Sequence, residues 1–137
     1  GKKAVVLGAG GASRAVVFGL AREGVREVLI ADCFPEKAQK IAADVRKLFK
    51  RVVYQAVPAG TPEVKEAVQK ADVIMNATPL GLKPQDPLVV PEDWIPKAGA
   101  KKQFFMDIIL LKRLKGIYDK FIKTLFFRAI KHKNSSF

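Results

Sequence analysis

The sequence has 137 residues, of which 49% are hydrophobic, and this is enough for one compact domain with a buried core. No apolar run approaches the roughly 20 residues that cross a bilayer, and the single cysteine, Cys33, excludes an intrachain disulfide and a cysteine-based zinc site. The formal net charge is +12, but residues 1–100 carry 15 basic and 11 acidic side chains, whereas residues 101–137 carry 10 and 2. We therefore expect a soluble, cytoplasmic protein whose excess charge belongs to its last quarter, and we expect neither nucleic acid nor a membrane as its partner. Cys33 is expected to be a small side chain that fills space.

Strands and helices alternate along the first half of the chain. Short, uniformly apolar runs such as Ala4–Leu7 are typical of strands that are buried on both faces of a parallel sheet. Between these runs, apolar residues recur at helical spacing; Pro35 and Pro62 stand where a helix can begin, and Gly24 stands where one can end. The pattern predicts strands at 4–7, 28–31, 52–57 and 72–76 and helices at 13–23, 35–49 and 61–70. Such alternation is typical of the α/β class, a doubly wound parallel sheet with flanking helices.

The last part of the chain differs in composition. Five of the eight prolines lie between residues 79 and 96, which predicts a loop on the surface or over a site, with Trp94 as its anchor. Residues 102–109 predict a fifth strand, and residues 110–133 predict a basic amphipathic helix with apolar side chains along one side. We therefore expect one domain of about five strands over residues 1–109, and a C-terminal segment, 110–137, whose helix packs on this domain or extends it.

A glycine-rich turn, Gly8-Ala9-Gly10-Gly11-Ala12-Ser13, joins the first predicted strand to the first predicted helix. In a dinucleotide-binding unit the first glycine permits a tight turn, the second lets the backbone approach the pyrophosphate, and a small third residue lets the helix pack close to the strand. Gly8, Gly10 and Ser13 occupy these places. The N–H groups at the start of the helix, together with its dipole, would then bind the phosphates. The alternative is that the turn only connects a strand to a helix.

Asp32 stands at the end of the second predicted strand, about 20 residues after the glycines, where an acidic side chain can accept hydrogen bonds from the ribose hydroxyls of a dinucleotide. An anion in this place would repel a 2′-phosphate, which favours NAD over NADP. Arg14 or Lys37 could nevertheless reach toward such a phosphate. The alternative is that Asp32 caps the helix that begins near Pro35.

Three segments carry a resemblance to a known family: GAGGASRA at residues 8–15, ADVIMNATPLGL at 71–82 and FFMDII at 104–109. Together they resemble the C-terminal NAD(P)-binding domain of shikimate and quinate dehydrogenases, over residues 1–109. The resemblance implies a Rossmann-like fold and an oxidoreductase that transfers a hydride between a nicotinamide and a cyclic hydroxy acid. It also implies that residues 8–13 hold the pyrophosphate, that Asn76, Ala77 and Thr78 line the nicotinamide end of the site, and that Asp107 and Ile108 help to form the cleft. The alternative is that residues 76–81 form an ordinary polar turn.

The sequence departs from the family's pattern in three places. NADP-using members commonly have asparagine, arginine and threonine where this chain has Asp32, Cys33 and Phe34, so the resemblance favours NAD, with NADP as the second choice. The family has a preceding domain that binds the hydroxy acid and supplies a catalytic lysine and aspartate, and we expect this chain to lack that domain. Leu110 stands where the family usually has a tyrosine, and the sequence diverges from there onward.

The leading hypothesis is therefore the NAD(P)-binding domain of a shikimate/quinate dehydrogenase-like oxidoreductase that lacks the substrate domain and binds shikimate or quinate only if that domain is supplied. The alternative is a non-catalytic nucleotide-binding module or remnant that needs a partner subunit. The sequence identifies no catalytic residue and no metal site, and Lys65, Lys70 and His132 are expected to be solvated surface side chains. The basic helix could contact nucleic acid or an anionic membrane. We expect it instead to bury its apolar side on its own sheet or on a second copy in a homodimer.

Overall fold

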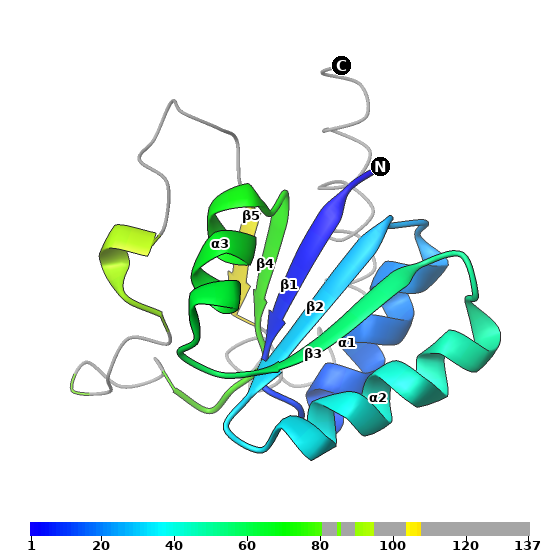
Figure 1. The fold of residues 1–137 in the computed structure, drawn as a ribbon, viewed down its shortest axis with the longest axis horizontal. Coiled ribbons are helices and arrows are strands. Elements are labelled where there is room, and N and C mark those ends of the chain that lie inside the picture. The colour runs from blue at the N-terminus through cyan, green and yellow to red at the C-terminus, as the bar shows by residue number, and fades with distance from the viewer. Residues whose placement is uncertain (81–84, 86–89, 95–103, 108–137) are drawn as a thin grey trace, which may run out of the picture.

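Five parallel strands form one sheet in the computed structural model, which describes residues 1–80, 85, 90–94 and 104–107 (Figure 1). The strands are β1 (Lys3–Leu7), β2 (Glu27–Asp32), β3 (Val53–Pro58), β4 (Val73–Asn76) and β5 (Phe104–Asp107). Their order is β3-β2-β1-β4-β5, and each neighbouring pair is parallel. The predicted parallel sheet is confirmed. Because β2 and β3 lie on one side of β1 while β4 and β5 lie on the other, the strand order reverses between β1 and β4, a place where such sheets bind ligands.

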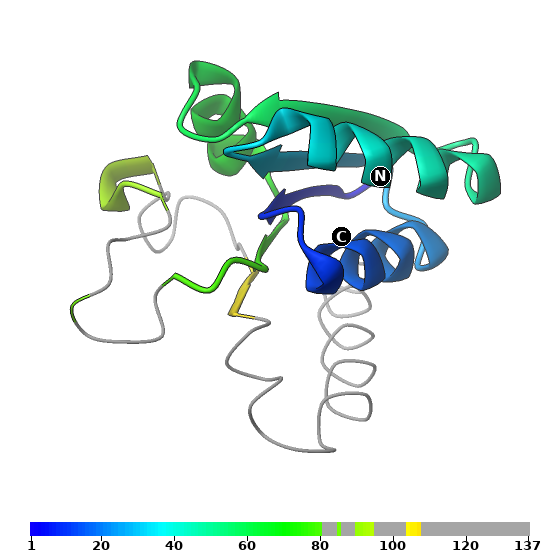
Figure 2. The ribbon, with the colours of Figure 1, turned by 90° about the horizontal axis from the view of Figure 1, so that it is seen from below.

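Helices cover both faces of this sheet. One face carries α1 (Gly11–Arg22) and α2 (Pro35–Leu48), and the other carries α3 (Pro62–Lys70) (Figures 1 and 2). Along β1 the side chains alternate between the two faces: Ala4 and Val6 belong to the apolar cluster under α1 and α2, whereas Val5 and Leu7 belong to the cluster under α3. The uniformly apolar strand is thus buried on both sides, as the sequence predicts.

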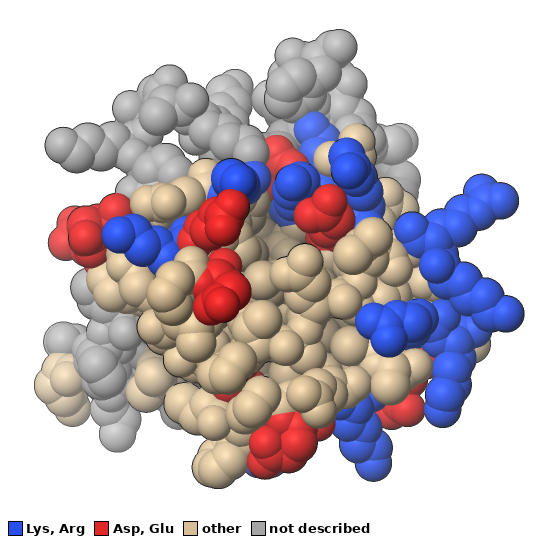
Figure 3. Space-filling model, viewed as in Figure 1, with Lys and Arg blue, Asp and Glu red and all other residues tan. Residues whose placement is uncertain are grey.

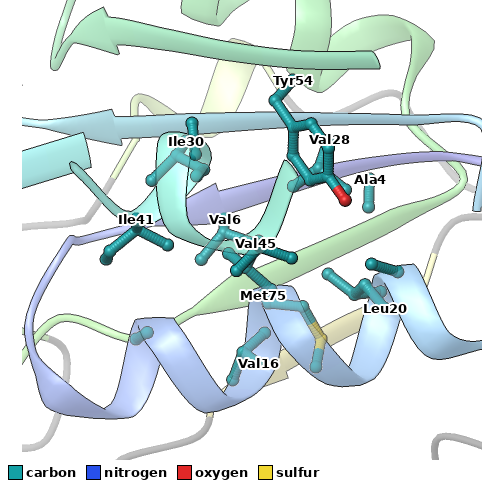
Figure 4. Close-up of a cluster of buried hydrophobic side chains, with 14 of the residues drawn as sticks. Ala4, Val6, Val16, Leu20, Val28, Ile30, Ile41, Val45, Tyr54 and Met75 are labelled. Carbon is teal, nitrogen blue, oxygen red and sulfur yellow. The ribbon is translucent and has the colours of Figure 1, made fainter. Parts of the chain in front are cut away.

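The larger apolar cluster lies between the sheet and the helices α1 and α2 (Figure 4). Val16 and Leu20 enter it from α1, and Ile41 and Val45 enter it from α2. Each pair is four residues apart, which places both side chains on the same side of their helix. The helical spacing of apolar residues therefore corresponds to the packing face, and this packing holds the start of α1 close to the end of β1.

The helix ends follow the turn residues. Pro35 and Pro62 are the first residues of α2 and α3, where a missing N–H is tolerated. Gly24 follows the end of α1 with a φ of +84°, and its N–H donates to the carbonyl oxygen of Ala21 at 3.1 Å. The start of α1 differs from the prediction, because the helix begins at Gly11, inside the glycine-rich turn. Gly11 is therefore part of the first turn of the helix, and Gly10 directly precedes it.

The proline-rich loop contains one short 3₁₀ helix, η1 (Glu92–Trp94). Val90 is buried before it, and Trp94 packs against the apolar cluster under α3, so the prediction that Trp94 anchors this loop is confirmed. The expectation that Cys33 fills space is wrong, because its side chain is exposed. Cys33 follows the last residue of β2, where the chain leaves the sheet and turns toward α2.

The predicted basic helix at residues 110–133 lies outside the described residues, so its packing on the sheet or on a second copy stays a prediction. Ile108, Leu110 and His132 lie outside them as well. Within the described part of the chain, no helix combines the length and the apolar character needed to cross a bilayer.

Candidate functional site

The glycine-rich turn and the segment after β4 meet at the same edge of the sheet. Leu7, the last residue of β1, pairs with Asn76, the last residue of β4, and the N–H of Ala77 donates to the carbonyl oxygen of Leu7 at 2.8 Å. Asn76 in turn pairs with Asp107, the last residue of β5. The carboxyl ends of the three strands therefore bring these predicted site residues together, as expected for neighbouring parallel strands.

Gly8 connects the two segments through a close backbone approach. Its φ is +99°, and a Cβ atom built on it would lie 3.0 Å from Cγ2 of Thr78 and 3.1 Å from the carbonyl carbon and oxygen of Ala77. Its N–H donates to the carbonyl oxygen of Ala31 at the end of β2, at 2.7 Å. A side chain at Gly8 would be strained by the backbone angle and would crowd the neighbouring segment. Gly8 thus fixes the turn between β2 and β4.

Gly10 and Gly11 form the open part of the turn. Both are exposed, and a Cβ atom at either one would meet nothing within 4 Å. Gly10 precedes the first residue of α1, and neither a capping side chain nor an acidic residue occupies the first turn of this helix. The first N–H groups of a helix have no carbonyl partner inside it, and the helix dipole makes this end electropositive. The arrangement can therefore accept an anion that approaches the backbone closely.

Ser13, Ala9 and Ala12 support the turn from below. All three are buried, and the Ser13 hydroxyl donates to the carbonyl oxygen of Gly8 at 2.6 Å. A ligand at the surface cannot reach this hydroxyl directly. Ser13 therefore closes the turn and lets α1 pack tightly, which is the role that the sequence pattern predicts for a small third residue.

Asp32 links the glycine-rich turn to the start of α2. One carboxylate oxygen, Oδ2, accepts from the N–H of Ala9 at 2.7 Å, and the other, Oδ1, accepts from the N–H of Phe34 at 2.8 Å. The alternative that Asp32 caps α2 is wrong, because Phe34 occupies the capping position and no side chain there makes a capping bond. Since an ionised carboxylate has about four acceptor positions, Asp32 can hold both backbone groups and still accept from ribose hydroxyls.

The two cations considered for a 2′-phosphate have different surroundings. Arg14 extends from α1 to Asp44 of α2, with its guanidinium nitrogen 2.5 Å from the carboxylate oxygen. The hydrogen bond from Arg14 is the main cause that holds the pKa of Asp44 below its ordinary value. Lys37 is exposed and places its ammonium nitrogen 5.0 Å from the centre of the Phe34 ring, near the end of β2. Lys37 is thus better placed than Arg14 to meet a ligand at Asp32.

Asn76 shapes the segment that follows β4. Its side chain is buried; Oδ1 accepts from the N–H of Thr78 at 3.0 Å and from the Thr78 hydroxyl at 2.6 Å, while Nδ2 donates to the carbonyl oxygen of Leu80 at 3.1 Å. Asparagine often bonds the backbone two residues further along the chain in this way, and such a polar turn is the alternative that the sequence left open for this segment. Asn76 positions the segment, and Thr78, which is partly exposed, lies nearer to solvent.

Lys65 and Lys70 are exposed on α3, and the ammonium group of Lys70 lies 2.6 Å from a carboxylate oxygen of Glu66. Lys70 lines a hollow beside α3 together with Lys3 and Glu27, which belong to the amino ends of β1 and β2. This hollow is at the opposite edge of the sheet from Gly8. Figure 3 looks onto the side of the sheet that carries α3 and shows charged side chains of both signs around an uncharged centre. Lys70 is therefore not placed to serve chemistry at the glycine-rich turn.

Comparison of the sequence with known proteins identifies one family. The model of the shikimate / quinate 5-dehydrogenase family matches residues 1–110. A shikimate dehydrogenase (NADP(+)) of Moorella thermoacetica is 40% identical over 97 residues, which are 69% of this chain and 32% of that protein. A shikimate dehydrogenase (NADP(+)) of Rhodopseudomonas palustris is 44% identical over 87 residues, covering 64% of this chain and 29% of that protein.

Solved structures show the same fold. Quinate dehydrogenase from Corynebacterium glutamicum in complex with NAD superposes with a TM-score of 0.69 at 23% identity, covering 86% of this chain and 40% of that one. Shikimate 5-dehydrogenase from Listeria monocytogenes, in complex with shikimate and NAD, gives a TM-score of 0.67 at 24% identity, covering 79% and 38%. The chain spans about a third of the length of the relatives that it matches in sequence. From the family match over residues 1–110, the chain belongs to the shikimate/quinate 5-dehydrogenase family of oxidoreductases.

Proposed function

We propose that this chain is the part of a shikimate/quinate-type dehydrogenase that binds the nicotinamide dinucleotide. One observation carries the proposal: the open start of α1 at Gly10, the carboxylate of Asp32 and the segment after Asn76 lie along one sheet edge, at the reversal of strand order. An anion at Gly10 and Gly11 with a ribose at Asp32 is the arrangement that a dinucleotide requires. The nicotinamide would then lie toward Ala77 and Thr78.

The chain's own contribution to the reaction is binding and orientation. The bound dinucleotide supplies the hydride chemistry. The N–H groups at Gly10 and Gly11 would hold the pyrophosphate, and Gly8 and Ser13 keep these groups in place. Ala77 and Thr78 would limit the position of the nicotinamide ring because their backbone is fixed against Gly8.

We propose NAD as the preferred cofactor and NADP as the weaker one. The carboxylate of Asp32 would repel a 2′-phosphate, and the two residues after it, Cys33 and Phe34, carry no positive charge. Lys37 is the cation near this turn that could oppose the preference. The sequence relatives named above are NADP(+) enzymes, whereas the two solved structures contain NAD; the proposed preference of this chain for NAD therefore rests on Asp32.

We propose further that the 137-residue chain alone binds the dinucleotide without oxidising shikimate or quinate. Hydride transfer needs a substrate held in near-contact with the nicotinamide, and orientation of this kind supplies about 7–11 kcal/mol of the barrier lowering. The second candidate function is a nucleotide-binding module without chemistry of its own. It is supported by the same arrangement of Gly10, Asp32 and the segment after Asn76 along one sheet edge.

The site can be tested by NMR on the isotopically labelled chain. Titration with NAD should shift the amide signals of Gly10, Gly11 and Phe34, while those of Glu66 and Lys70 on α3 stay unchanged and serve as the internal control. Shifts confined to α3 and the amino ends of the strands would contradict the proposed site.

A further inference from the structure

Phe34 is a large aromatic side chain that the fold leaves outside its core. It is 56% exposed, and it belongs to neither apolar cluster. Other exposed large apolar side chains are Phe18, Leu48, Val53 and Leu80. Phe18 differs because its ring meets Phe49 edge-on at 5.2 Å, which makes it part of the packing between α1 and α2. Within the described part of the chain, Phe34 has no such ring partner. Packing against another ring therefore does not explain why an aromatic side chain stands at this position.

The backbone of Phe34 is fixed relative to the glycine-rich turn. The carboxylate of Asp32 accepts from the N–H of Phe34 at 2.8 Å and from the N–H of Ala9 at 2.7 Å. One side chain therefore joins the proposed ribose position, the proposed phosphate position and the backbone that carries the aromatic ring. The carbonyl oxygen of Phe34 accepts from the N–H of Lys37 at 3.0 Å, which ties it to the first turn of α2 as well.

The surroundings of the ring suit a flat, nitrogen-containing base. The ammonium of Lys37 lies 5.0 Å from the ring centre, yet more than half of the Phe34 side chain remains open to solvent. An aromatic ring stacks on a purine through its face, in an offset arrangement that does not depend on the identity of the base. In an adenine dinucleotide the base is joined directly to the ribose that Asp32 would hold, so it emerges next to Phe34.

We infer that the Phe34 ring stacks on the adenine base of the bound dinucleotide, and that Asp32 and the first turn of α2 hold the ring in place for this contact. The inference rests on the proposed function and adds a binding residue to it. The ligand class is a purine dinucleotide whose adenosine ribose lies at Asp32. Stacking on Phe34 adds affinity without selecting between NAD and NADP, because both carry the same base.

The test compares Phe34→Ala with Phe34→Tyr, which keeps the ring, and with Phe34→Leu, which keeps apolar bulk without a ring. Leu48→Ala is the matched control, because Leu48 is also exposed and lies at the other end of α2. NAD and nicotinamide mononucleotide, which has a phosphate and a ribose but no adenine, are titrated into each folded chain. Proton NMR follows the ring-current shift of the adenine H2 and H8 signals.

Phe34→Ala and Phe34→Leu should each weaken NAD binding by about tenfold or more and remove most of the upfield adenine shift, since loss of one base–aromatic stack costs on this order. Phe34→Tyr and Leu48→Ala should keep the NAD affinity and the upfield adenine shift of the parent chain. Binding of the mononucleotide should be the same in all variants. Unchanged NAD affinity in Phe34→Leu, or equal weakening of both ligands, would overturn the stacking role while leaving the proposed function in place. If the parent chain bound neither ligand, the proposed function itself would fail, and the stacking role with it.

Discussion

Gly8 and Gly10 lie two residues apart in one turn but are needed for different reasons. Gly8 has a positive φ and only a crowded space for a Cβ atom next to Ala77, whereas Gly10 has a φ of −85° and open space around it. Gly8→Ala should therefore destabilise the fold by about 1–3 kcal/mol through backbone strain and crowding. Gly10→Ala should change the free energy of unfolding by less than about 0.5 kcal/mol yet weaken NAD binding, because its methyl group would point into the space proposed for the pyrophosphate.

Urea unfolding and NAD titration of both variants separate these effects, and each variant is the control for the other. Equal loss of stability in the two variants would contradict the structural assignment of Gly8. Full retention of NAD affinity in Gly10→Ala would contradict the close approach of the pyrophosphate.

Asp32 combines a structural role with the proposed cofactor preference. In Asp32→Ala, both cofactors lose the support that Asp32 gives to Ala9 and Phe34, but only NAD loses a favourable ribose contact and only NADP is relieved of repulsion. Loss of one hydrogen bond to a charged group costs about 1.5–3 kcal/mol, so the ratio of NADP to NAD dissociation constants should fall measurably. Asp32→Asn, which keeps the shape and removes the charge, should lower this ratio as well. Calorimetric titration of both cofactors checks the ratio, and equal affinity of the parent chain for NAD and NADP would refute the preference.

At the scale of the elements, Arg14 joins α1 to α2 through Asp44. The hydrogen bond from Arg14 is the largest cause of the lowered pKa of Asp44, so Arg14→Ala should raise this pKa toward 3.8, the ordinary value. Because the pKa is lower in the folded chain than in the unfolded one, the stabilising effect is present above about pH 4 and is lost as the pH falls through the folded value. The effect on stability should be small, since the pair is exposed.

NMR titration of the Asp44 carboxyl carbon measures the shift in pKa, with Glu66, which is paired to Lys70, as the unaffected control. An unchanged Asp44 pKa in Arg14→Ala would contradict the assigned cause.

Most elements were predictable because each has a signal in its own sequence. Apolar runs identified the buried strands, and Pro35, Pro62 and Gly24 marked helix ends. The polar residues of the site were harder to interpret, since the same side chain can bind a ligand or hold a turn. Asn76 and Ser13 were predicted as site residues; both lie at the sheet edge that carries the glycine-rich turn, and their side chains bind the protein's own backbone. The expectation for Cys33 was wrong for a similar reason. A small side chain in a turn can be either buried or exposed, and its sequence does not indicate which.

The described residues hold a five-stranded parallel sheet beside the proposed phosphate site, and the chain spans about a third of the length of its sequence relatives. The two halves of a dehydrogenase reaction can therefore be measured separately. At the proposed site, binding of the dinucleotide would need only the edge of the sheet that carries Gly8, Asp32 and Asn76. Turnover needs in addition a substrate held against the nicotinamide and a group that exchanges a proton.

The most direct test of this account is one purified sample of the 137-residue chain, verified free of host dehydrogenase, in which NAD binding is measured by calorimetry and NADH formation is measured with shikimate and with quinate. We expect saturable binding of NAD, weaker binding of NADP, and no NADH formation above the background of a Gly10→Ala control. Absence of NAD binding would contradict the proposed site. Robust turnover in the same sample would contradict the claim that residues 1–137 bind the cofactor without providing a substrate site.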